Sequence, residues 1–120
     1  MLDYTAFARD WEAGWNSHDL DRIMAHYCDD IVFRSRKAVP LTGAGEVRGH
    51  EALRAYWAAA LKRQPDLRFK VVDVFEGHEM LVISYRNHRG VLAAETLCFD
   101  AEGKVYWAAA CHRPEGRATT

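Results

Sequence analysis

The chain has 120 residues, the length of one domain. Lysine and arginine number 16 and aspartate and glutamate 17, so the net charge is −1, and no basic excess indicates binding to nucleic acid or an anionic membrane. No apolar run approaches the ~20 residues of a membrane span, and the acidic start lacks a signal-peptide core. Three scattered cysteines without metal-ligand spacing are typical of reduced thiols, so we expect a cytoplasmic protein.

The first half of the chain reads mainly as helix. Apolar residues recur at steps of three and four from Tyr4 to Trp15, which predicts an amphipathic helix. A second helix is expected over Leu20 to Tyr27. A third runs from about His50 to Arg63, because that stretch is rich in alanine and leucine and stops before Pro65.

Between the second and third helices, Ile31–Phe33 predicts a short strand. The following segment, Arg34–Arg48, contains Pro40, Gly43 and Gly45 and is expected to be a loop or a small hairpin.

The second half reads as strands joined by short connections that each hold a glycine. The predicted strands are Leu67–Glu76, Glu79–Asn87, Val91–Phe99 and Val105–His112. Short connections make consecutive strands antiparallel. Helices followed by a long antiparallel meander predict an α+β fold over residues 1–113, with residues 114–120 as a flexible tail.

Four segments carry a resemblance to a known family: Trp15–Asp21, Tyr27–Phe33, Arg48–Leu53 and Glu95–Val105. Their order and spacing resemble the nuclear transport factor 2-like superfamily, in particular its SnoaL-like and ketosteroid isomerase-like branches. The resemblance implies a cone, in which a curved antiparallel sheet wraps around three N-terminal helices and encloses an apolar pocket. It also implies a homodimer formed through the outer sheet face.

Within this resemblance, the ketosteroid isomerases allow a test residue by residue. Their mechanism needs a carboxylate base, a tyrosine and a protonated carboxylic acid. Those positions fall on Ser35, Trp11 and Glu95 of this chain. Only Glu95 is a residue of the type that the mechanism needs at its position. Ketosteroid isomerase activity is therefore not expected, whereas a pocket position for Glu95 is strengthened.

Glu95 is also prominent without the resemblance. Alternation along Val91–Phe99 puts it on a strand face whose other members are apolar. A carboxyl group there is costly unless it is paired, hydrogen-bonded or neutral. Two interpretations stay open: an acid that donates a hydrogen bond or transfers a proton, and a structural partner of an arginine or a backbone amide.

His112 is the second candidate catalytic residue. It ends the last predicted strand and shares a face with Tyr106, Ala108 and Ala110, a face that lines the pocket by the resemblance. A Glu95–His112 pair could share a proton, with the histidine near its usual titration range. The alternative is an exposed histidine at a strand end.

Aromatic residues form the candidate ligand-binding set. The resemblance places Trp11, Trp15, Tyr27, Trp57 and Tyr85 around the cavity, and Phe33 belongs to the same aromatic group. Together they suggest a pocket for an aromatic ligand, although core packing explains any one of them. Asn87 could hold a ligand carbonyl, but a role in its own turn is favoured.

The remaining polar clusters point to structure more than to chemistry. Arg34–Lys37 could attract an acidic substrate or form a solvated loop. His18–Asp19 and Asp29–Asp30 lie at helix ends and lack the spacing of a metal site, while His78 and His88 are expected in turns. No cofactor or metal is expected.

Three functions remain open. One is a cofactor-independent isomerase, cyclase or dehydratase that uses Glu95, with His112, for proton transfer on an apolar carbonyl compound. The others are a non-catalytic binder of a small hydrophobic or aromatic molecule and a dimeric interaction module. The expected dimer face is apolar and consists of Val72, Val74, Met80, Val82, Ala94 and Cys98.

Overall fold

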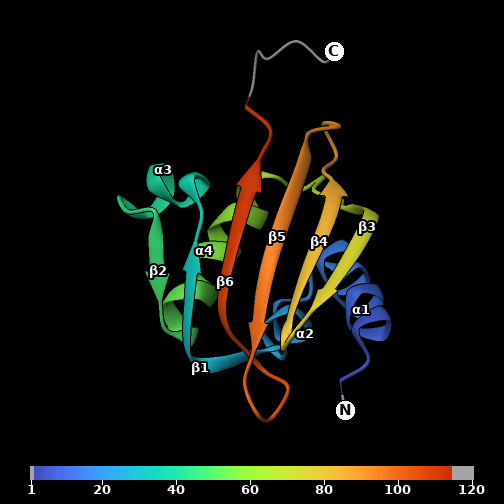
Figure 1. Cartoon of the computed structure of the whole chain (residues 1–120). Helices are drawn as coiled ribbons and strands as arrows, with labels where there is room; N and C mark the ends of the chain where they lie inside the picture. Colours follow the sequence, from blue (N-terminus) through green and yellow to red (C-terminus); the bar gives the residue numbers. More distant parts are fainter. Residues whose placement is uncertain (1, 115–120) are drawn as a thin grey trace.

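The computed structural model describes residues 2–114 and shows helices packed against one sheet (Figure 1). Its elements are α1 Tyr4–Ser17, α2 Leu20–Met24, β1 Tyr27–Arg34, a 3₁₀ turn Arg36–Ala38, α3 Val39–Thr42, β2 Glu46–Arg48, α4 His50–Arg63, β3 Lys70–Gly77, β4 Met80–Arg86, β5 Leu92–Phe99 and β6 Val105–His112. The predicted tail lies, from residue 115 on, outside the described residues. None of the helices in residues 2–114 is long and apolar enough to cross a membrane.

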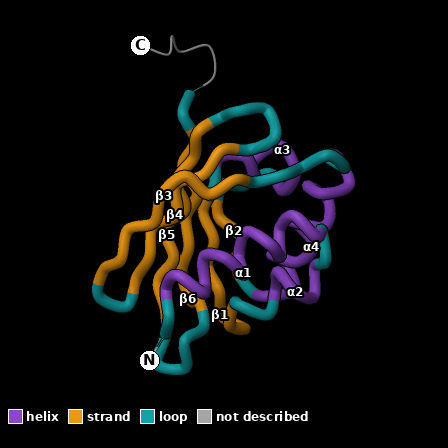
Figure 2. Tube along the Cα trace, turned by 90° about the vertical axis from the view of Figure 1, so that its right-hand side faces the viewer, coloured by secondary structure: helices purple, strands orange, loops and turns teal. Residues whose placement is uncertain are grey.

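The sheet has six strands in the order β2-β1-β6-β5-β4-β3. All neighbours are antiparallel except β1 and β6, which run parallel. α1, α2 and α4 cover one face, as the side view shows (Figure 2). The α+β prediction is confirmed: the sheet is curved and unclosed, and its concave face receives the helices.

Some predicted boundaries shift. The second helix ends at Met24, and Tyr27 already begins β1. The predicted loop or hairpin contains β2, which pairs antiparallel with β1 and so is a hairpin with short helical turns at its tip. The third predicted helix is observed as α4, and it ends where Pro65 disfavours a helical Gln64.

Irregular pairing changes which side chains face inward. β6 shifts register against β5 between Cys98 and Phe99, so Tyr106 is an extra residue and is 47% exposed. It was expected to face the pocket with Ala108, and that expectation is wrong. β3 is irregular between Val71 and Asp73, which turns Val74 toward the core. Val74 therefore leaves the predicted outer face.

The helical face of the core is set by α1. Asp3 caps this helix by accepting a hydrogen bond from the Ala6 backbone N–H at 3.0 Å. The buried residues Phe7, Trp11 and Trp15 follow the predicted apolar stripe and pack on the sheet. The spacing of these residues places the indole rings of Trp11 and Trp15 on the side of α1 that packs against the concave face of the sheet.

Polar side chains of α1 bind the chain that enters β3. Asn16 Nδ2 donates to the Phe69 carbonyl at 2.9 Å, and the Phe69 N–H donates to Asn16 Oδ1 at 2.7 Å. The Val71 N–H donates to Glu12 Oε2 at 2.6 Å, and His18 Nε2 bonds the Leu67 carbonyl at 2.7 Å. These bonds satisfy backbone groups that a strand at the sheet edge would otherwise leave unpaired.

We predict that Asn16→Ala destabilises the protein by about 1–3 kcal/mol, because it leaves two partly buried backbone groups of Phe69 without partners. Urea unfolding measures the change. Arg9→Ala, on the exposed side of the same helix, is the control and should stay within about 0.5 kcal/mol of the unmodified protein. Equal stability of the two variants would contradict the role of this side chain.

Candidate functional site

Glu95 lies in the middle of β5, between Ile83 of β4 and Ala110 of β6. The strand is regular there, so alternation points the side chain to the concave face as predicted, and the residue is only 4% exposed. Its Oε2 atom has no hydrogen-bond partner among the described residues. The carboxyl is therefore buried without a cation to compensate its charge.

Burial raises the pKa of Glu95 to about 8. Trp11 and Tyr85 lie close enough to lower this pKa, but burial has the larger effect, and Trp11 Nε1 forms no hydrogen bond of good geometry. The carboxyl is consequently protonated at neutral pH. A protonated carboxylic acid has one O–H to donate.

An aromatic shell surrounds this acid. Phe69 stacks on Trp11 with ring centroids 5.5 Å apart and meets the Tyr85 ring at 4.6 Å. Trp57 contacts Trp15 at 4.9 Å and Phe33 at 5.3 Å. These edge and stacked contacts join α1, α4 and the sheet into one apolar wall.

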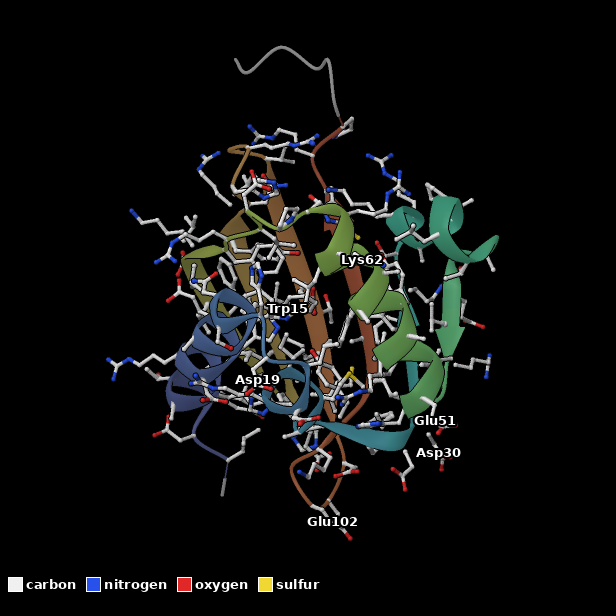
Figure 3. All side chains as sticks on the ribbon, turned by 180° about the vertical axis from the view of Figure 1, so that it is seen from behind. Trp15, Asp19, Asp30, Glu51, Lys62 and Glu102 are labelled. Carbon is white, nitrogen blue, oxygen red and sulfur yellow. The ribbon has the colours of Figure 1, made fainter. Side chains whose placement is uncertain are left out.

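A cavity of about 80 Å³ remains between this shell and the sheet. Its lining includes Glu95, His112 and most of the predicted ligand set, namely Trp15, Phe33, Trp57, Tyr85 and Asn87. Trp15 lies between the helices and the sheet (Figure 3). The volume is well below the roughly 300–1,000 Å³ of drug-sized sites, so the aromatic side chains fill most of the cone.

The other two members of the predicted set, Trp11 and Tyr27, are buried behind the cavity wall. Burial and the nearby Glu95 raise the pKa of the Tyr27 hydroxyl, so that hydroxyl remains protonated. Both residues interact with Glu95 and do not line the cavity themselves.

Buried polar atoms without partners concentrate in this region. Six such side-chain atoms occur in the described residues: Trp11 Nε1, Trp15 Nε1, Tyr27 Oη, His88 Nδ1, Glu95 Oε2 and His112 Nδ1. Four belong to residues that line the cavity, and Trp11 and Tyr27 interact with Glu95. Native proteins pair nearly all buried polar groups, so the polar atoms of the residues that line the cavity are open to a hydrogen-bond partner there.

His112 differs from its expected state. It pairs across β5 with Ala93 rather than with Glu95, and its Nδ1 is unpaired. Burial and then the positive charges of Lys37 and Arg36 lower its pKa to about 4. The histidine is therefore neutral at neutral pH, and the expectation that it titrates near its usual range is wrong.

Asn87 serves its turn, as favoured from the sequence. Its Oδ1 accepts hydrogen bonds from the Arg89 and Val91 N–H groups at 2.9 and 3.0 Å. Ser35 likewise serves the backbone, since its Oγ accepts from the Lys37 N–H at 3.2 Å. The oxygen atoms of both residues are thus already in use.

The cavity lining also includes residues outside the predicted site, among them Lys37, Tyr56, Phe69 and His88. Tyr56 lies by Ser35, and burial raises its pKa to about 12. Phe69 lay inside the predicted strand Leu67–Glu76 but precedes the observed β3, which begins at Lys70. His88 was assigned to a turn, which it occupies, but its side chain points inward and is 10% exposed.

Asp29 and Asp30, which were expected at a helix end, lie instead inside β1 and are exposed. Asp19 caps α2 by accepting from the Asp21 and Arg22 N–H groups. In residues 2–114, no group of three or more histidine, cysteine, aspartate and glutamate side chains is arranged to hold a metal ion.

Solved structures share this fold. A SnoaL-like protein of unknown function from Burkholderia thailandensis is 37% identical, with a TM-score of 0.87 over 92% of this chain and 95% of that one. TerC, crystallised with polyporic acid, is 14% identical (TM-score 0.76, 92% and 91% covered). A candidate polyketide cyclase from Sinorhizobium meliloti is 12% identical (TM-score 0.74, 92% and 100% covered). The last two show the fold alone.

Among curated proteins, no sequence matches this chain. The sequence profile of the SnoaL-like domain matches residues 8–117, a span that includes the cavity-lining residues from α1 to β6. The chain therefore belongs to the SnoaL-like domain family, within the nuclear transport factor 2-like superfamily.

Proposed function

We propose that the cavity binds a small aromatic or unsaturated carbonyl compound and that Glu95 donates its proton to the carbonyl oxygen. The observation that carries this proposal is the group of four unpaired buried polar atoms on residues that line one cavity, with the protonated Glu95 among them. The aromatic walls favour a flat apolar body. At fold level, one neighbour was crystallised with polyporic acid and another is called a candidate polyketide cyclase.

The proposed chemistry is enolisation, a proton transfer common to isomerases, cyclases and dehydratases. A hydrogen bond from Glu95 withdraws electron density from the carbonyl and makes the neighbouring C–H more acidic. The O–H proton of Glu95 then passes to the carbonyl oxygen while a base takes the carbon-bound proton, which yields the enol. His112 is neutral and offers an imidazole nitrogen as that base, a weak one because its pKa is about 4.

The second candidate is a non-catalytic binding protein. Its supporting observations are the small cavity of about 80 Å³ and the replacement of the isomerase base and tyrosine by Ser35 and Trp11. A pocket that admits no ligand would leave the dimeric interaction module as the alternative.

The pKa of Glu95 leads to a stability prediction. Folding raises this pKa from 4.5 to about 8, so the folded protein holds the proton more tightly than the unfolded chain does. The resulting stability is complete below pH about 4.5 and is lost as the pH rises to about 8, at roughly 1.4 kcal/mol per pH unit at most. Glu95→Gln is neutral at every pH and should remove this loss.

Urea unfolding between pH about 5 and 9 tests this prediction. The stability of Glu95→Gln relative to the unmodified protein should rise with pH. Glu102→Gln changes an exposed carboxyl and should keep the unmodified pH dependence. Parallel stability curves for Glu95→Gln and the unmodified protein would show that the buried carboxyl is not held neutral.

Binding and proton transfer are tested together with acetophenone, a small aromatic ketone, and with ethylbenzene, which lacks the oxygen. Acetophenone should shift the Glu95 side-chain carbon signal in NMR spectra and bind several-fold more tightly than ethylbenzene, because only the ketone accepts a hydrogen bond. In D₂O, the protein should also accelerate deuterium exchange into the acetophenone methyl group.

Glu95→Gln separates the two candidates, since its amide can still donate a hydrogen bond but cannot transfer a proton. For an enzyme, this variant should bind acetophenone and lose the exchange. Binding without accelerated exchange in the unmodified protein would leave the non-catalytic binder. Equal affinity for ketone and hydrocarbon would contradict the hydrogen bond from Glu95 and leave only a binder of apolar molecules.

We also propose a homodimer through the outer sheet face. After the correction at Val74, this face carries exposed Phe75 and Met80 and half-buried Val82 and Cys98, an apolar surface costly to leave in water.

Light scattering should give about twice 13.7 kDa for the unmodified protein and a smaller mass for Val82→Glu. The control Ala55→Glu, on the exposed side of α4, should remain dimeric. A monomeric unmodified protein at high concentration would refute the dimer.

The cytoplasm remains the proposed location. Cys28, Cys98 and Cys111 are unpaired thiols, which supports a reducing compartment.

A further inference from the structure

His88 lines the same cavity as Glu95 and has no assigned role, whereas His112 is the proposed base. His88 follows β4, its side chain is 10% exposed, and its Nδ1 has no partner. Its Nε2 lies 3.6 Å from Asp66 Oδ1, which is too long for a hydrogen bond. His112 ends β6, and its Nδ1 is also unpaired.

The chain around these imidazoles is strongly basic. The segments 34–39, 60–67, 86–91 and 110–114, each of which contributes cavity-lining residues, together contain eight arginine or lysine residues and one acid, Asp66. The opposite end carries acidic side chains, among them Asp30, Glu51 and Glu102 (Figure 3). A chain of net charge −1 thus concentrates positive charge where the cavity opens.

This positive charge extends into the cavity. Lys37 and Arg36 both lower the pKa of His112, so their field reaches its ring. α4 ends at this side, and Lys62 and Arg63 in its last turn offset the partial negative charge of its carbonyl end. An anion would therefore be stabilised beside the two histidines.

The polar groups are separated by an apolar stretch of suitable length. Glu95 pairs with Ala110, and His112 lies two residues further along β6, about 7 Å along the strand. Phe33, Trp57 and Phe69 line the same cavity. The polar groups of the cavity therefore belong to different positions along its apolar wall.

We infer that the ligand carries an acidic oxygen, such as a carboxylate, at its outer end, where His88 contacts it within the basic opening. Its inner end carries the oxygen that accepts from Glu95. The ligand class is thus an aromatic or unsaturated keto acid. This inference rests on the proposed function and adds the acidic group to it.

Three probes test the inference by calorimetry: acetophenone, 4-acetylbenzoate and methyl 4-acetylbenzoate. The three share the ketone, and only 4-acetylbenzoate has an anion at the other end. It should bind about tenfold more tightly than its methyl ester, as a hydrogen bond to a charged group provides. The difference should shrink as salt is added, because salt screens the basic opening.

Variants identify the residues that recognise the anion. Arg36→Gln should reduce the preference for the acid over the ester while leaving the affinity for acetophenone within about twofold, because Arg36 does not line the cavity. His88→Phe should also reduce this preference. Arg9→Gln and His78→Phe change an exposed arginine and an exposed histidine and should preserve the preference.

The outcomes separate this inference from the proposed function. If acetophenone binds and the acid binds no better than the ester, the inference is overturned and the proposed function stands. A preference for the acid that survives both Arg36→Gln and His88→Phe overturns the assignment of the anion to this opening. If none of the probes binds, both the proposed function and the inference fail.

Discussion

The structure depends on the burial of one carboxyl group among aromatic rings. Glu95 is 4% exposed, its Oε2 has no partner within the described chain, and the neighbouring donors do not outweigh the loss of water. The group therefore holds its proton, and the shell around it can remain apolar. A paired carboxylate at this position would need a cation inside the shell and would have no proton to give.

The surrounding fold buries Glu95 but leaves a cavity beside its carboxyl group. α1 is bound to the chain entering β3 through Asn16 and Glu12, which holds Trp11 and Trp15 against the sheet. Register shifts in β3 and β6 interrupt the regular pairing, and such bulges bend a sheet. The curved sheet and the helices leave a small cavity whose basic opening and protonated inner end differ in charge. A ligand would be oriented by that difference as well as by shape.

The alternation of residues along a strand predicted side-chain directions correctly where the strand pairs regularly with its neighbours, and wrongly where the pairing is irregular. β5 pairs without interruption from Leu92 to Cys98, so the inward direction of Glu95 could be read from the sequence. In β6 the extra residue Tyr106 reverses the side of the sheet on which the preceding side chain, Val105, lies. In β3 the irregular pairing turns the side chain of Val74 toward the core in the same way. A bulge depends on contacts with the neighbouring strand and leaves no period in the sequence. His88 was missed because a turn has no period from which to read direction.

Local periodicity and composition determined a single α+β chain with α1, α4 and the late strands near their observed places, as well as an acid on an apolar face. These features follow from spacing along the chain, which needs no knowledge of distant residues. The tertiary structure decided the parallel pairing of β1 with β6, the assembly of His88 and His112 at one opening, and the neutral state of both Glu95 and His112. Each of these depends on which residues from separate segments exclude water from a site or bring charge to it, and only the folded chain sets those distances.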